Sequence, residues 1–115
     1  MRDFIQVAKA ISDPTRARIL KMLEAGELCV CHITERLGLA QSTVSRHLTQ
    51  LRYAGLVVGR KQGLWVYYRL EDGAINAHNL AFLALLRASL NGDPQIQSDR
   101  QAGAVVCCDQ NLEAA

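Results

Sequence analysis

Four cysteines are the residues of this 115-residue chain whose type and spacing best fit a specific chemistry. Cys29 and Cys31 are separated by one residue, and Cys107 and Cys108 are adjacent near the end of the chain. Thiolates are soft ligands, so they select soft ions such as As(III). Two thiolates leave a trigonal As(III) site one ligand short, and either Cys107 or Cys108 is expected to supply the third.

The spacing of the first pair constrains the backbone that carries it. Positions i and i+2 of an α-helix lie about 200° apart, so both sulfurs reach one ion only if Cys29 lies outside the helix or the helix start frays. Ion binding then deforms the start of the helix that contains Cys31. If the next helix binds DNA, ion and DNA weaken each other's binding by the same factor.

The composition predicts one compact domain. Half of the residues are apolar but only 5% are aromatic, which favours packed helices over a β-sandwich. No apolar run approaches the roughly 18 residues that a membrane span needs. We expect a cytoplasmic protein with no membrane contact, in which thiols stay reduced, with a folded domain over residues 1–92 and a flexible tail over 93–115.

Apolar residues at helical spacing predict four helices in the first half of the chain. The first covers about residues 2–11, and the second starts at Asp13-Pro14, a helix cap followed by a favoured first position, and runs to Gly26. The third carries Val30, Ile33 and Leu37 and ends at Gly38. The fourth ends near residues 54–55. Two helices joined by a three-residue connection are typical of a helix-turn-helix.

The fourth helix has the side chains of a DNA-recognition helix. Burying its apolar stripe leaves hydrogen-bonding side chains on the other faces, which suit base edges and phosphates. Two β-rich runs follow, around a turn at residues 60–63, and predict the wing of a mainly α winged helix-turn-helix. The predicted DNA-binding residues are Gln41, Ser42, Thr43, Ser45, Arg46 and Gln50 on the helix and Arg60 and Lys61 on the wing.

The charge distribution supports a polyanionic partner. Residues 36–70 contain no Asp or Glu and carry a charge of +6, whereas the rest of the chain carries −4. Residues 74–90 predict a last helix that is apolar nearly all round, more than so short a chain can cover. We therefore expect a homodimer, formed through the first and last helices, that matches a palindromic double-stranded operator.

These motifs together resemble the ArsR/SmtB family of metalloregulatory repressors, in its arsenic-responsive branch. The resemblance covers roughly residues 4–90 and rests on Asp13-Pro14-Thr15-Arg16, Glu27-Leu28-Cys29-Val30-Cys31, Gln41 to Leu48 and Arg60-Lys61-Gln62-Gly63. It implies a transcriptional repressor that is released from DNA when As(III) or Sb(III) binds Cys29 and Cys31. Cd- and Pb-responsive relatives share the cysteine motif.

The chain departs from that branch at the position of its usual third cysteine, where it has Thr34, so Cys107 or Cys108 is the expected substitute. Three alternatives stay open. His32 beside Cys31 allows a tetrahedral Zn or Cd site. Disulfide formation among the four cysteines would make the protein a thiol redox sensor. A thiol-dependent arsenate reductase is disfavoured, because no oxyanion loop or base accompanies either pair, and we expect no enzyme activity.

Overall fold

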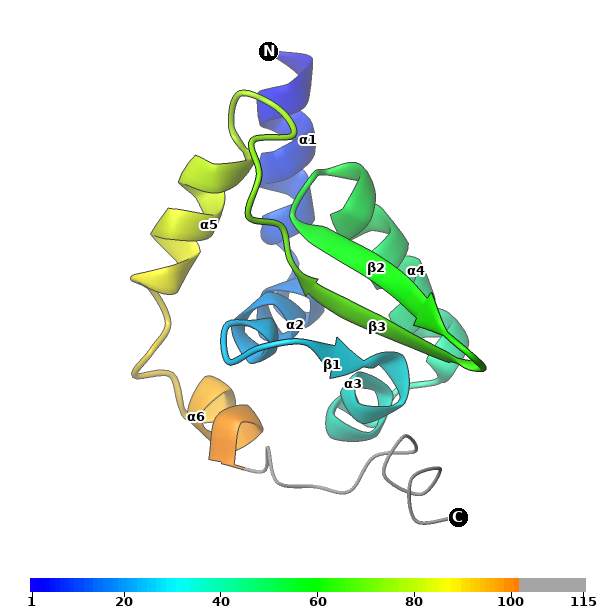
Figure 1. Cartoon of the computed structure of the whole chain (residues 1–115). Coiled ribbons are helices and arrows are strands. Elements are labelled where there is room, and N and C mark those ends of the chain that lie inside the picture. Colours follow the sequence, from blue (N-terminus) through cyan, green and yellow to red (C-terminus); the bar gives the residue numbers. More distant parts are fainter. Residues whose placement is uncertain (102–115) are drawn as a thin grey trace.

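The computed structural model describes residues 1–101 (Figure 1). Five helices and a small sheet form the main body: α1 (Arg2–Ile11), α2 (Pro14–Leu23), α3 (Val30–Leu37), α4 (Gln41–Tyr53) and α5 (Asn79–Arg87), with β1 (Leu28–Cys29), β2 (Val57–Gln62) and β3 (Trp65–Leu70). A further helix, α6 (Pro94–Gln101), follows α5. The predicted winged helix-turn-helix is confirmed, with α3 and α4 as its two helices and β2–β3 as its wing.

Local signals place the helix ends where the sequence predicts them. The Asp13 side chain accepts a hydrogen bond from the Arg16 amide at 3.1 Å, and Pro14 opens α2. Gly38 ends α3 with a φ of 69°, a left-handed conformation that costs glycine little. The connection from Gly38 to α4 is therefore short, which fixes α4 across α3.

The sheet has the strand order β1-β3-β2 and is antiparallel throughout. Strand β1 was not expected from the sequence, because two residues are too few to show a period. Its Cys29 lies opposite Tyr67 of β3, and on the other side Tyr67 lies opposite Arg60 of β2. One row across the sheet thus connects the first cysteine to the wing.

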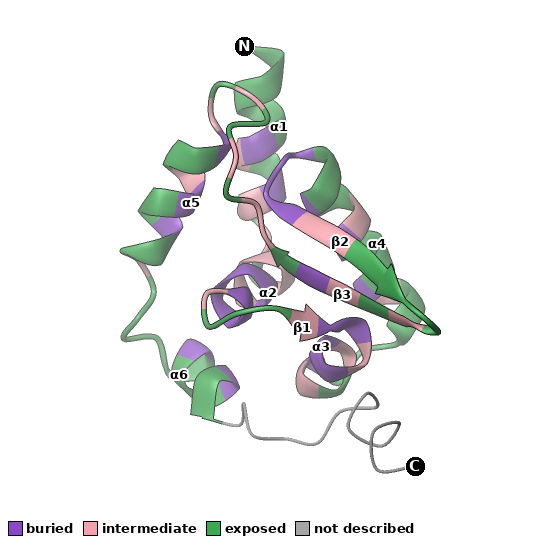
Figure 2. Cartoon of the chain, viewed as in Figure 1, coloured by how far each residue is buried: buried purple, intermediate pink, exposed green. Residues whose placement is uncertain are grey.

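The core lies where α1, α2, α3 and α4 meet the base of the wing (Figure 2). Its fully buried side chains include Val7, Ile19, Leu20, Ile33, Val44, Leu48, Leu51 and Leu56. Burial of these apolar side chains provides the main driving force for folding. Within residues 1–101, no helix has the length and apolar character needed to cross a membrane.

Two segments differ from the predicted elements. The last long helix begins at Asn79 rather than near residue 74, because Asn79 and Asn76 bind backbone carbonyls instead of continuing a helix. The Asn79 amide donates to Gly55 O at 2.8 Å and to Gly73 O at 2.9 Å, and Asn76 donates to Ala54 O. These bonds tie the start of α5 to the end of α4.

The second difference is α6, which lies where flexibility was expected. Asp93 caps it, accepting from the amides of Gln95 and Ile96, and Pro94 opens it. The helix packs on α2 through buried Ile96 and through the buried carboxylate of Asp99, which accepts two hydrogen bonds from Arg18 at 2.9 Å each. That bond raises the pKa of Arg18. Ile96 and Asp99 therefore anchor the segment that follows α5, as far as the end of α6, to the rest of the domain.

Candidate DNA interface and cysteine site

Helix α4 buries one face and exposes the other. Val44, Leu48 and Leu51 are fully buried, while the predicted DNA-binding side chains of α4 lie on the remaining surface: Gln41, Ser42, Ser45, Arg46 and Gln50 are exposed and Thr43 is half-buried. Within residues 1–101, Arg46 makes no ion pair with any carboxylate. The helix thus presents polar side chains and an available cation together.

Arg16 orients this helix, a role that sequence reasoning missed. Its guanidinium donates to the carbonyls of Ala10 and Lys9 at the end of α1, at 2.7 and 3.1 Å. It also donates to Gln50 Oε1 at 2.6 Å and lies 3.3 Å from His47 Nδ1. Arg16 therefore connects α1 to α4 and holds Gln50 in place. Its position in the Asp-Pro-Thr-Arg motif was the only available signal.

The two wing residues predicted to contact phosphate, Arg60 and Lys61, differ in their interactions within the protein. Lys61 is exposed and makes no ion pair within the described part of the chain. Arg60 forms a two-pronged ion pair with Glu27, with Nη2–Oε1 and Nε–Oε2 distances of 2.6 and 2.9 Å. The guanidinium also lies 4.7 Å from the centre of the Tyr67 ring. Arg60 is thus engaged within the protein itself.

Cys29 lies outside helix α3, as the two-cysteine site requires. It is the residue before the helix, with extended backbone angles, and its Sγ accepts a hydrogen bond from the His32 amide at 3.3 Å. Cys31 lies in the first turn. Both cysteines are disulfide-bonded in the structure, so neither is a free thiol.

The two cysteines line a pocket of about 260 Å³ together with α4 and the wing. From α4 it includes Gln41, Ser45 and Thr49, and from the wing Leu64, Trp65, Val66 and Tyr68. Trp65 Nε1 is buried and has no hydrogen-bond partner among the described residues. A group bound to both sulfurs would therefore lie beside both α4 and the wing.

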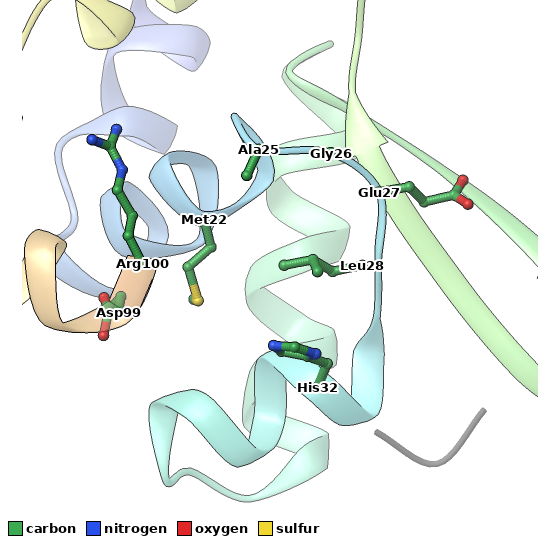
Figure 3. A pocket seen from close by; sticks show the side chains of 8 residues that line it. All are labelled: Met22, Ala25, Gly26, Glu27, Leu28, His32, Asp99 and Arg100. Atoms are coloured by element: carbon green, nitrogen blue, oxygen red, sulfur yellow. The ribbon is translucent and has the colours of Figure 1, made fainter. Parts of the chain in front are cut away.

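A second pocket, of about 240 Å³, lies on the other side of the cysteine segment (Figure 3). Leu28 and His32, which flank the two cysteines, line it with Met22 of α2 and with Asp99 and Arg100 of α6. The last turn of α6 thus lies near the cysteine segment. Cys107 and Cys108 lie outside the described residues, and residues 1–101 contain no cluster of three or more His, Cys, Asp or Glu arranged to hold a metal ion.

Comparison with known proteins places this architecture in a family. A family model described as bacterial regulatory protein, arsR family, matches residues 13–58, from the cap of α2 to the start of the wing. An arsenical resistance operon repressor of Bacillus subtilis is 36% identical over 77 residues, which make up 66% of this chain and 73% of that protein. The chain belongs to the ArsR family. It has the winged helix-turn-helix fold of that family.

Two further relatives match a shorter stretch of this chain with higher sequence identity. An arsenic resistance transcriptional regulator of Pseudomonas putida is 54% identical over 66 residues, which cover 56% of this ArsR-family chain and 52% of the relative. A cadmium resistance regulatory protein homologue of Staphylococcus aureus is 42% identical over 71 residues, covering 61% of this chain and 59% of the relative. The chain therefore spans little more than half the length of these two relatives.

Solved structures share the fold. HlyU from Vibrio cholerae is 36% identical with a TM-score of 0.64, covering 76% of this chain and 90% of HlyU. The homodimeric winged helix-turn-helix domain of a possible ArsR-family regulator from Mycobacterium bovis is 30% identical, also with a TM-score of 0.64, covering 76% of this chain and 77% of that domain.

Proposed function

We propose that this ArsR-family protein is a homodimeric repressor that binds a palindromic operator and is released when As(III) or Sb(III) binds the reduced thiolates of Cys29 and Cys31. The observation that carries this proposal is the pocket that both cysteines share with Ser45 of α4 and Trp65 of the wing. Named relatives of the family act in arsenic resistance, which is consistent with this choice of ion.

In this proposal α4 lies in the major groove. Ser42, Thr43, Ser45 and Arg46 approach base edges and phosphates, while Gln41 and Gln50 lie at the margins of the same surface. Lys61 approaches phosphate from the wing, where a lysine acts as a point charge. Arg16 fixes the angle at which α4 is presented, because it holds Gln50 against the end of α1.

Release follows from the position of Cys29. Its extended backbone belongs to β1, whereas Cys31 belongs to α3, so an ion that draws the sulfurs together pulls strand and helix toward each other. Helix α3 packs on α4 and β1 packs on β3. The ion therefore changes the relative position of recognition helix and wing, and the ion-bound form fits DNA less well.

The third thiolate is assigned to Cys107 or Cys108. Gln101, the last residue of α6, and Cys107 are only six positions apart in the sequence, and extended chain of that length reaches about 20 Å. The last turn of α6 shares a pocket with Leu28 and His32. The short connection from docked α6 supports a third ligand from the same subunit.

The dimer interface is assigned to α1 and α5. Several of their large apolar side chains are exposed, among them Phe4 at 46%, Ile5 at 43% and Leu85 at 62%. Phe4 and Phe82 are in ring contact, with centroids 5.3 Å apart, so the two helices form one surface. An apolar surface of this kind is typical of a subunit interface. A homodimeric structural neighbour supports the proposal that this chain forms a homodimer.

Fluorescence anisotropy of an operator duplex from the gene's own upstream region, titrated with arsenite in excess reductant, tests this function. We expect arsenite to release the parent protein, and a Cys107→Ser/Cys108→Ser variant to need far more. If the parent and this variant respond equally to arsenite, Cys29 and Cys31 are sufficient for release. A parent released only by Cd, Pb or Zn would instead make it a regulator of those ions.

A second candidate function is favoured by the disulfide-bonded state of Cys29 and Cys31. If thiol oxidation is the signal, peroxide or diamide should release DNA with all metals chelated, and a reductant should restore binding. Release by oxidant together with indifference to arsenite would replace the metalloid proposal.

A further inference from the structure

The ion pair between Glu27 and Arg60 joins the cysteine segment to the wing. The carboxylate binds Nη2 and Nε of Arg60, and the third guanidinium nitrogen, Nη1, donates to Gln62 Oε1 at 2.7 Å. Every nitrogen of Arg60 therefore has an acceptor within the protein. In Figure 3 the Glu27 side chain points away from the pocket, over the strands of the wing.

Arg60 differs in this respect from the other cations predicted to bind DNA. Arg46 and Lys61 make no ion pair within residues 1–101 and are available to phosphate. Arg60 is also accessible to solvent, because its side chain is 51% exposed. A guanidinium binds carboxylate and phosphate with the same two-pronged geometry. Glu27 therefore occupies the place where a DNA phosphate would bind Arg60.

We propose that Glu27 competes with DNA phosphate for Arg60 and that the cysteine segment controls the outcome. On operator binding, Arg60 exchanges Glu27 for a phosphate. Glu27 precedes Cys29 by two residues, and Cys29, Tyr67 and Arg60 form one row across the sheet. A movement of the cysteine segment therefore moves the carboxylate relative to Arg60. This second, inducer-linked step rests on the proposed function, whereas the competition for Arg60 does not.

The exposure of the pair indicates that Arg60 binds Glu27 and a DNA phosphate with similar affinity. Both carboxylate oxygens of Glu27 accept hydrogen bonds from the Arg60 guanidinium, at 2.6 and 2.9 Å, so the pair is a charge-assisted contact of the kind that a phosphate would make. The pair is largely solvent-exposed, with Arg60 at 51% and Glu27 at 28%, and exposed ion pairs are weak. A phosphate can therefore displace Glu27, and removing the competitor should strengthen DNA binding about two- to fivefold at moderate salt.

Glu27→Gln tests the competition, with Asp72→Asn as its matched control. Both variants remove one negative charge from a carboxylate that pairs with a wing arginine, but Asp72 pairs with Arg69, at 3.7 Å, rather than with Arg60. Operator affinity is measured by anisotropy over a series of salt concentrations. We expect Glu27→Gln to bind about two- to fivefold tighter than the parent and Asp72→Asn to change affinity much less.

The Arg60→Gln variant makes the test specific to this contact. It should weaken binding and reduce the slope of log affinity against log salt by about one, as expected for one lost phosphate contact. In the Arg60→Gln background, Glu27→Gln should have no further effect. Three results would overturn the competition: a gain no larger than that of Asp72→Asn, a loss of affinity in Glu27→Gln, or a gain that persists without Arg60.

The inducer-linked step has its own readout. If arsenite moves the cysteine segment so that Glu27 competes more strongly for Arg60, Glu27→Gln should gain more operator affinity with arsenite than without it, and the ratio of the two affinities should shrink. An unchanged ratio would refute the link between cysteine segment and wing. A parent that ignores arsenite would refute the proposed function, while the affinity and salt measurements would still decide the competition.

Discussion

Releasing α6 from the domain should raise the arsenite concentration needed to free the operator. The helix has eight residues, too few to be stable alone, and two of its side chains, Ile96 and Asp99, are buried. An Asp99→Ala/Ile96→Ala variant removes both the apolar contact and the acceptor of the Arg18 hydrogen bonds. Ser98→Ala, at an exposed position of the same helix, is the matched control.

The magnitude follows from the length of the tether. With α6 docked, Cys107 is six positions from the fixed residue Gln101. With α6 released, the nearest fixed residue is Arg87 at the end of α5, twenty positions from Cys107. Loop closure scales as three halves of RT times the logarithm of length, so the longer tether costs about 1 kcal/mol more. That corresponds to about sixfold more arsenite for half-maximal release.

The assay is the arsenite titration by anisotropy, with hydrogen exchange of residues 94–101 to verify that the helix is released. DNA affinity without arsenite should stay near that of the parent, because α6 packs on α2. A variant with released α6 and an unchanged arsenite response would refute the positioning role of α6.

Mixed dimers test whether the ligands come from one subunit. Dimers of a Cys29→Ser/Cys31→Ser protomer with a Cys107→Ser/Cys108→Ser protomer should stay bound to the operator when arsenite is added. Release would place the ligands on different subunits.

Three further substitutions test other parts of the structure. Arg46→Ala should weaken operator binding by about 1–3 kcal/mol at constant salt, measured by anisotropy. Cys29→Ser should leave DNA binding intact and block release by arsenite in the same assay. Lys21→Met should lower the free energy of unfolding in urea by about 2–3 kcal/mol, because buried Lys21 donates to Leu86 O and Asn91 Oδ1 at 2.9 Å each.

Each of these substitutions has an outcome that would contradict it. If Arg46→Ala binds the operator as tightly as the parent, the assignment of α4 to the DNA interface is wrong. If arsenite still releases Cys29→Ser from the operator, the ion site proposed at β1 and α3 is wrong. An unfolding free energy unchanged in Lys21→Met would mean that the carbonyls at the end of α5 find water instead of the buried ammonium group.

Much of the fold was predictable because its signals are local. The Asp13-Pro14 cap, the left-handed Gly38 and the apolar stripes of α3 and α4 each involve residues within a few positions of one another. Helix α6 carried the same type of signal, since Asp93-Pro94 has the residue types of Asp13-Pro14. It was missed because the weakly apolar stretch that follows has only Ile96 to bury, and docking depends on Arg18 in a distant helix.

The amino-acid sequence by itself determined which residues have the chemistry of the candidate sites: two closely spaced thiols, an acid-free basic stretch and a polar helix face. Its local patterns also determined the helices that carry them. Only the tertiary structure decided which of these groups meet. Strand β1 pairs with the wing, Glu27 occupies Arg60, Arg16 holds α4 against α1, and α6 docks beside the cysteine segment. The physical reason is that such contacts join residues tens of positions apart, so their geometry depends on how the whole core packs.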